Sequence, residues 1–244
     1  MARSRDQSTL HNRVLAHVGP AIVAGAYPPG HVLTLEGLER DYGVSRTVAR
    51  EAVRVLQSMR LVSSRPRVGV TVLDTTQWSV FDPQLIRWRL AGDERSAQLR
   101  SLTELRAAVE PPAAAAAALR AEPAQRERLL ELSEMMQDLG QRGELDAFMH
   151  HDIEFHRLVL EQSGNEMFAG LADVVAEVLA GRAEHHLMPA HPRREALRLH
   201  SHVATAVRDG LPQVAESAMR GICAEVVAAL DHLDHSVSDG TPHG

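Results

Sequence analysis

Residues 44–60, which read VSRTVAREAVRVLQSMR, decide how the N-terminal part of this chain folds. Serine stands at position 45, where its side chain can accept a hydrogen bond from the first turn of a helix. Apolar residues then recur at intervals of three and four, which predicts an amphipathic helix that begins after Ser45. Arg46, Arg50 and Arg54 are four residues apart, so they share one solvent-facing side. The predicted apolar stripe consists of Val48, Ala52, Val55, Leu56 and Met59.

The segments on either side of this helix fit a winged helix-turn-helix. Upstream, residues 35–42 (LEGLERDY) predict a shorter helix, which Gly43 can end in the left-handed conformation. Downstream, residues 61–64 (LVSS) and 69–73 (GVTVL) predict two short strands joined by the basic link RPRV. In a helix-turn-helix, the second helix enters the major groove of DNA by its N-terminal end. The order of elements therefore favours DNA binding over a solvated helix that merely carries three arginines.

The candidate DNA contacts lie at the start of the second helix and on the wing. Arginine can bond guanine through two hydrogen bonds, and serine and threonine hydroxyls can reach phosphates or base edges. A glycine on the wing lets the backbone approach DNA closely. The candidates are Ser45, Arg46, Thr47, Arg50, Arg65, Arg67 and Gly69.

Charge divides the 244-residue chain into two unlike parts. The net charge is −6, yet residues 1–77 contain ten arginines against six acidic residues. The remainder is strongly acidic, which indicates two parts with different partners. One cysteine, Cys223, excludes an intrachain disulfide and fits a reducing compartment. Without a secretory signal or a membrane-spanning run, we expect a cytoplasmic protein with no membrane partner.

The second part of the chain carries only helical patterns. Aromatic residues make up 3% of the chain, so leucine, valine and alanine must form most of the core, which favours packed helices. The fold class is therefore mainly α: a winged helix-turn-helix followed by an all-helical bundle. The expected organisation is 1–77 for DNA binding, 78–90 as a linker with a first short helix of the second domain, 91–235 as the helical ligand-binding domain, and 236–244 as a disordered tail.

A metal site is suggested within the helical part. Asp152 and His156 are four residues apart on a predicted helix, so they share a face and could bind a divalent metal. His200, on a later helix, is a candidate third ligand. Spacing alone favours solvated or capping histidines, and His150 with Glu154 forms a competing pair.

The N-terminal motifs resemble those of the GntR family of bacterial regulators. The resemblance rests on residues 25–30 (GAYPPG), 44–56 and 65–72 (RPRVGVTV), and it covers about residues 10–74. It implies that Arg46, Thr47, Arg50 and Gly69 contact double-stranded DNA. It also implies a homodimer that binds an inverted-repeat operator.

The C-terminal part resembles the FCD effector domain of the FadR subgroup. The motifs are residues 102–111 (LTELRAAVEP), 152–165 (DIEFHRLVLEQSGN) and 200–210 (HSHVATAVRDG). The resemblance implies a divalent metal, such as Zn²⁺, held by one aspartate and three histidines. Asp152, His156 and His200 match three of these ligands.

The expected fourth histidine is replaced by Ile222. Three ligands could still hold Zn²⁺, with water and effector completing its shell. Alternatively, the site is metal-free and its polar groups bind the effector directly. The adjacent Cys223 is a poor substitute, because one residue along a helix turns a side chain by roughly 100°.

Two further residues are candidate effector contacts. Arg106 resembles the arginine that pairs with an effector carboxylate in this domain, although it could instead form a surface ion pair with Glu110 at i+4. Asn165 could line the pocket or cap the next helix, and we favour the cap.

Residues 65–69 (RPRVG) and 78–88 (WSVFDPQLIRW) resemble a subset of FadR-type regulators that govern sugar-acid use. A sugar acid such as gluconate or galactonate is therefore the leading effector class, and other carboxylates and acyl-CoA remain open. We expect a DNA-binding repressor that a small carboxylate releases, and not an enzyme. The alternatives are a metal-dependent helical enzyme with a DNA-binding module, and a constitutive DNA-binding protein with a vestigial sensor.

Overall fold

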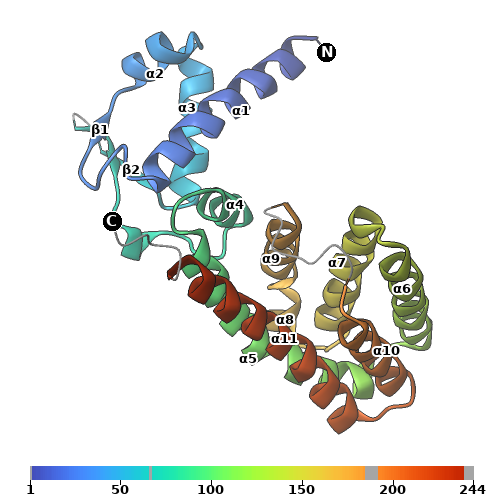
Figure 1. The fold of residues 1–244 in the computed structure, drawn as a ribbon. Coiled ribbons are helices and arrows are strands. Elements are labelled where there is room, and N and C mark those ends of the chain that lie inside the picture. The colour runs from blue at the N-terminus through green and yellow to red at the C-terminus, as the bar shows by residue number, and fades with distance from the viewer. Residues whose placement is uncertain (1, 66–67, 185–191, 239–244) are drawn as a thin grey trace. The chain divides into compact units, whose positions relative to one another are not determined.

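The chain folds into two compact units, Met1–Arg95 and Ser96–Gly244, which are described separately (Figure 1). The computed structural model describes residues 2–65, 68–184 and 192–238. The fold is mainly α, with a winged helix-turn-helix in the first unit and a helical second unit, as the sequence predicts.

The first unit contains helices and a small sheet. In chain order its elements are α1 (Ala2–Val23), β1 (Val32–Leu33), α2 (Leu35–Tyr42), α3 (Arg46–Ser58), β2 (Val62–Arg65), β3 (Gly69–Val72), the 3₁₀ turn η1 (Thr75–Gln77) and α4 (Pro83–Ala91). The sheet is antiparallel in the order β1-β3-β2, and Thr71 on the central strand pairs with both Val32 and Ser63. The strand β1 was not predicted, because two residues are too few to show alternation.

The tight turn between α2 and α3 follows from local capping. Thr34 accepts a hydrogen bond from the backbone N–H of Gly37 and begins α2, while Gly43 ends it with φ +62°. Ser45 accepts from the N–H of Val48 at 3.4 Å and begins α3. The buried side of α3 packs against α1 and α2 through Val48, Ala49, Ala52, Val53 and Leu56.

The segment that joins the wing to the helical bundle packs on the first unit. The buried side chains of Trp78 and Leu85 belong to the N-terminal core, and α4 lies against α1. Gly19 makes this contact possible, since a Cβ there would lie 2.2 Å from the Trp88 ring. The sequence interpretation of 78–90 as a linker with the first helix of the second domain therefore differs from the structure, because two tryptophans supply apolar area that the first core buries.

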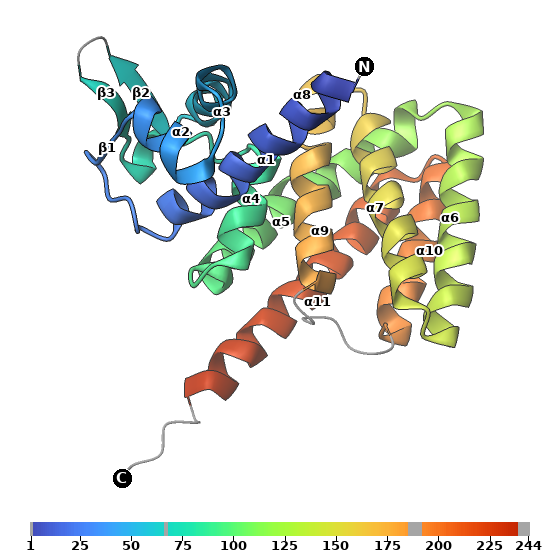
Figure 2. The ribbon, with the colours of Figure 1, turned by 90° about the horizontal axis from the view of Figure 1, so that it is seen from above.

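The second unit is a helical bundle. Its helices are α5 (Arg95–Arg120), α6 (Pro123–Arg142), α7 (Leu145–Glu161), α8 (Glu166–Ala169), α9 (Ala172–Glu184), α10 (Arg194–Arg208) and α11 (Pro212–Ser238). Helix α7 packs on both α6 and α9, and α10 packs on both α6 and α11 (Figure 2). The core consists largely of leucine, valine and alanine. Helix α11 extends to Ser238, into the tail expected at 236–244, and residues 239–244 lie outside the described residues.

None of the described helices combines the length and apolar character needed to cross a membrane.

Candidate functional site

The N-terminal end of α3 presents an exposed polar surface. Ser45, Arg46, Thr47 and Arg50 are all exposed there, as the candidate DNA contacts require. Arg46 is held on α2, because its Nη1 lies 2.9 Å from Glu36 Oε1. The hydrogen bond to Arg46 contributes to a lowered pKa of Glu36, after the larger effect of a backbone hydrogen bond.

The arginines along this face differ in their partners. Arg54 is paired with Glu51 one turn away, at 2.5 Å. Within the described residues, Arg50 forms no ion pair with an acidic side chain, so its guanidinium is available to an incoming anion.

The wing is placed only in part. Arg65 is exposed and pairs in register with Gly69, whereas Arg67 lies outside the described residues. Gly69 has φ +105°, and a Cβ there would lie 3.0 Å from Val32 Cγ1. Close approach to DNA is one expected reason for glycine at this position. Its backbone conformation and its contact with β1 give it a second.

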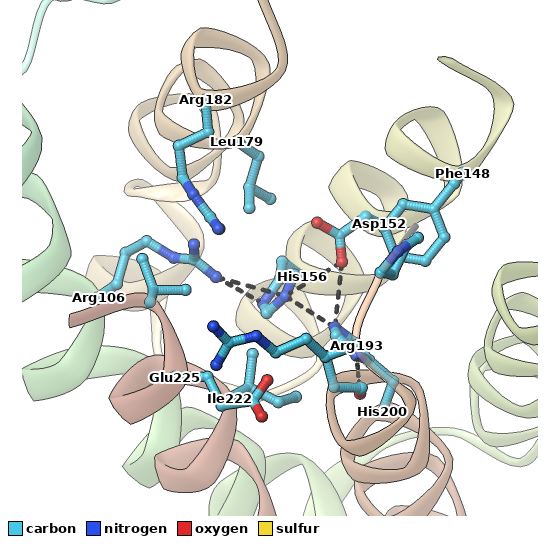
Figure 3. Close-up of a pocket in the computed structure, with 13 residues that line it drawn as sticks. Arg106, Phe148, Asp152, His156, Leu179, Arg182, Arg193, His200, Ile222 and Glu225 are labelled. Carbon is cyan, nitrogen blue, oxygen red and sulfur yellow. Dashed lines mark hydrogen bonds and ion pairs between the residues drawn. The ribbon is translucent and has the colours of Figure 1, made fainter. Parts of the chain in front are cut away.

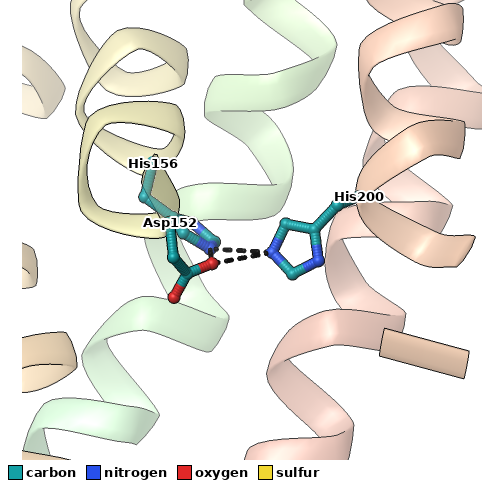
Figure 4. Close-up of side chains that lie close together, drawn as sticks. All are labelled: Asp152, His156 and His200. Carbon is teal, nitrogen blue, oxygen red and sulfur yellow. Dashed lines mark hydrogen bonds and ion pairs between the residues drawn. The ribbon is translucent and has the colours of Figure 1, made fainter. Parts of the chain in front are cut away.

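The second site is formed by a carboxylate and two imidazoles buried between α7 and α10 (Figure 4). Asp152 Oδ1 lies 3.1 Å from His200 Nε2 and 3.6 Å from His156 Nε2, and the two Nε2 atoms are 3.4 Å apart. Ligands of a tetrahedral zinc ion, with bonds of about 2.05 Å, stand about 3.3 Å apart. The three atoms therefore have the spacing that a small divalent cation requires.

Hydrogen bonds on the far side of each ring orient the two imidazoles. Nδ1 of His200 donates to the carbonyl of Ala196 at 2.7 Å, and Nδ1 of His156 lies 2.6 Å from Glu110 Oε2. With Nδ1 as the donor, each Nε2 can offer its lone pair to a cation that Asp152 also binds. These donors fit Zn²⁺, which binds imidazole and carboxylate and is held by three protein ligands in sites that keep an open position.

Asp152 is ready to act as a ligand because it stays ionised. Burial raises the pKa of Asp152, but the hydrogen bond from His200 and the charges of His156 and Arg106 outweigh it and hold the pKa well below its usual range.

Arg106 and Glu110 form a buried ion pair beside these ligands. Their side chains are 1% and 0% exposed, and Arg106 Nε lies 2.5 Å from Glu110 Oε1. The ion pair with Glu110, expected at the surface as the alternative role of Arg106, does form, but it lies in the core. Burial raises the pKa of Glu110, but Arg106 and His156 lower it further, to about 2. The Nη1 of Arg106 is buried and has no hydrogen-bond partner in the described part of the chain.

A cavity of about 140 Å³ opens beside these groups (Figure 3). A buried water needs roughly 10–15 Å³ on the same scale, so this space can hold a small molecule. Polar groups enter it from α5, α7, α9, α10 and α11, and Ile222, where the resemblance implies a fourth ligand, lines it from α11. The described lining residues are Arg106, Phe148, Asp152, His156, Leu179, Arg182, Pro192, Arg193, Ala196, His200, Ile222, Glu225 and Val226.

The structure adds two arginines to the site and gives Glu110 a second role. Arg182 on α9 and Arg193 before α10 line the cavity, and Glu110 positions His156. Spacing identifies Glu110 as an i+4 ion-pair partner of Arg106, but it does not indicate the contact of Glu110 with His156 on another helix. Asn165 caps α8, where its Oδ1 accepts from the N–H of Met167, and it is not among the described residues that line the cavity.

Comparison with known proteins gives two family matches and several relatives. Residues 101–225 match the FCD domain, and residues 10–72 match the bacterial regulatory proteins of the gntR family. The galactonate operon transcriptional repressor of Escherichia coli (strain K12) is 30% identical over 169 residues, which covers 68% of this chain and 72% of that protein. The uncharacterized HTH-type transcriptional regulator YieP of the same strain is 29% identical over 158 residues, which covers 64% of this chain and 69% of that protein.

Among solved structures, E. coli McbR/YncC is similar over 92% of this chain and 98% of the McbR/YncC chain, with 21% identity and a TM-score of 0.53. This similarity is one of fold. The matched families and the named relatives are transcription regulators rather than enzymes. The chain belongs to the GntR family of bacterial transcription regulators and carries an FCD domain behind its DNA-binding helix-turn-helix.

Proposed function

We propose that this regulator is a repressor whose affinity for DNA falls when a small carboxylate, most simply a sugar acid, binds in the cavity of the second unit. The observation that carries the proposal is the buried Nη1 of Arg106, an unsatisfied donor beside Asp152, His156 and His200. A relative that is 30% identical is named as the repressor of a galactonate operon, which supports the effector class.

The DNA-binding side of the proposal rests on α3 and the wing. Regulators of this family bind DNA and are generally dimeric. We infer that α3 enters the major groove, and that a homodimer binds an inverted-repeat operator. The contacts would come from Ser45, Arg46, Thr47 and Arg50 on the helix, with Arg65, Arg67 and Gly69 on the wing.

Arg106 would hold the effector carboxylate through a charge-assisted hydrogen bond from Nη1. Its Nε and Nη2 stay bound to Glu110, which fixes the direction of the free donor. Asp152, His156 and His200 would hold Zn²⁺ or a similar ion. When bound, the metal would supply a positive centre that attracts the carboxylate.

The same contacts give a physical route from effector to helix packing. Glu110 on α5 touches both Arg106 and the metal ligand His156 on α7. Any shift of Arg106 toward an effector changes the ion pair with Glu110 and therefore the position of His156. An effector changes DNA affinity only by the difference between its affinities for the free and DNA-bound states.

A mobility-shift titration tests this proposal. The protein, with Zn²⁺, is bound to DNA from upstream of its own coding region and titrated with gluconate and galactonate. We expect retarded DNA without sugar acid and its release as sugar acid is added. Absence of a sequence-specific complex would refute the DNA assignment, and a complex that neither sugar acid affects would refute these effectors.

The remaining alternative is a DNA-binding protein whose sensor no longer responds. A thermal-shift experiment with a broad panel of carboxylates, with and without Zn²⁺, distinguishes this alternative from our proposal. A ligand that binds only the folded protein raises the melting temperature. We expect a rise, and a flat response across the whole panel would favour the vestigial sensor.

A further inference from the structure

Three arginines meet at the effector cavity, and one of them, Arg106, is paired with a carboxylate. Figure 3 shows the guanidinium groups of Arg106, Arg182 and Arg193 directed toward the same space from three segments. Glu110 binds Arg106 through both of its carboxylate oxygens. Within the described residues, Arg182 and Arg193 make no ion pair.

The position of Arg182 is unfavourable without an anion. It projects from α9 toward Asp152 and the cavity, and its residue is partly buried. Burial and the positive charge of Arg106 lower the pKa of Arg182 to about 10, and the negative charge of Asp152 opposes them only in part. A buried charge without a counter-ion costs free energy, which an anionic ligand would recover.

Among the described residues, none of the carboxylates around the cavity forms an ion pair with Arg182 or Arg193. Asp152 is bound to His200 and faces the second imidazole, and Glu110 is bound to Arg106. Glu225 on α11 is the remaining carboxylate among the described lining residues, and it makes no ion pair there. Even if Glu225 turned toward one arginine, the other would still have no carboxylate in direct contact.

We propose that the effector carries two separated anionic groups, and that Arg182 and Arg193 bind the second. The first group would occupy the position beside Arg106 and the Asp152, His156 and His200 cluster. This inference rests on the proposed function and narrows its effector from a sugar acid with one charge to one with two. A second carboxylate and a phosphate share the necessary chemistry, because arginine binds both through paired hydrogen bonds.

Isothermal titration of the full-length protein with three matched probes tests the inference. Gluconate has one carboxylate, glucarate has two, and 6-phosphogluconate has a carboxylate and a phosphate. With Zn²⁺ present, we expect at least one of the two doubly anionic probes to bind about tenfold or more tighter than gluconate. The tighter of the two identifies the second group as carboxylate or phosphate.

Single variants identify which residues produce the preference. Arg182→Gln and Arg193→Gln should each remove most of the advantage of the doubly anionic probe and leave gluconate binding nearly unchanged. Arg220→Gln is the matched control, since Arg220 lies on α11, is exposed and pairs with Glu216. The melting temperature of ligand-free Arg182→Gln verifies its folding. It should not fall, because the substitution removes a charge that has no ion-pair partner among the described residues.

The two levels of the proposal fail in different ways. If gluconate binds as tightly as both other probes, or if the arginine variants keep the preference, the two-anion inference is wrong while the sensor function stands. If none of the three probes binds, both this inference and the sugar-acid assignment are refuted.

Discussion

Single residues explain why the buried charges of the second unit are tolerated. Glu110 accepts hydrogen bonds from Arg106 and contacts Nδ1 of His156, so one carboxylate serves both a cation and a candidate metal ligand. Carboxylates behind metal-bound histidines orient the ring and increase its basicity. The position of Glu110 therefore bears on metal affinity as well as on stability.

Glu110→Gln should weaken zinc binding. The amide keeps the size of the side chain but loses the charge that orients His156, so we expect zinc affinity to fall about 10–100-fold. Competition with a chromogenic chelator measures this affinity, after circular dichroism has verified the fold. Glu216→Gln, on an exposed ion pair of α11, should leave it unchanged. Equal zinc affinity in Glu110→Gln and the native protein would contradict the positioning role.

The buried thiol should be unreactive in the folded protein. Cys223 is 2% exposed, and burial raises its pKa to about 12. At pH 8 the thiolate would be about one part in ten thousand, and thiolate is the reactive species. Because folding raises this pKa, the contribution of the neutral thiol to stability is present at neutral pH and is lost as the pH rises from about 9 toward 12. Iodoacetamide should label Cys223 quickly in urea and very slowly without it; rapid native labelling would contradict the buried environment.

Neighbouring arginines on α3 should differ in their effect on DNA binding. Arg50 lies near the start of the helix without an acidic partner in the described chain, whereas Arg54 is one turn further along and paired with Glu51. Arg50→Ala should lower operator affinity about 10–100-fold, as expected for loss of a base contact. Arg54→Ala should have a smaller effect in the same anisotropy titration. Equal losses, or none, would argue against entry by the N-terminal end.

At the scale of helices and strands, the sequence predicts most of what local signals determine. Ser45 and Gly43 mark the helix-turn-helix boundaries because capping depends on adjacent residues. The spacing of Asp152 and His156 predicts a shared helix face, but no local signal brings His200 to them. His200 is one candidate among several histidines, and the resemblance favours it. The position of Arg182 follows only from the packing of α9, since the chain contains many arginines.

The packing of α4 on α1 gives a prediction for the first unit. In Gly19→Ala the new Cβ would lie 2.2–2.6 Å from atoms of the Trp88 ring, which forces the two helices apart. Overpacking of this kind costs about 1–3 kcal/mol. Thermal unfolding should show a lower midpoint for the first unit. Gly92→Ala is the control, because its Cβ would be at ordinary contact distances of 3.6–3.7 Å. A normal midpoint in Gly19→Ala would contradict the close contact.

At the scale of the whole molecule, the two units divide the chemistry. The basic, exposed surface of α3 lies in the first unit, and the effector cavity with its buried charges lies entirely in the second. The unequal charge of the two halves of the sequence already indicates this division. The sequence could not supply the charge balance inside the cavity, because that depends on which arginines and carboxylates meet after folding.

Reciprocal binding is the most direct test of ligand-controlled DNA binding. If a sugar acid lowers operator affinity by some factor, operator DNA must lower the affinity for that sugar acid by the same factor. Calorimetric titration of 6-phosphogluconate, glucarate or gluconate into the zinc-loaded protein, with and without operator DNA, measures both states. We predict weaker sugar-acid binding to the DNA complex, by the factor found in the mobility-shift experiment. Equal affinity in the two states would contradict the account, because the cavity would then not control the DNA-binding unit.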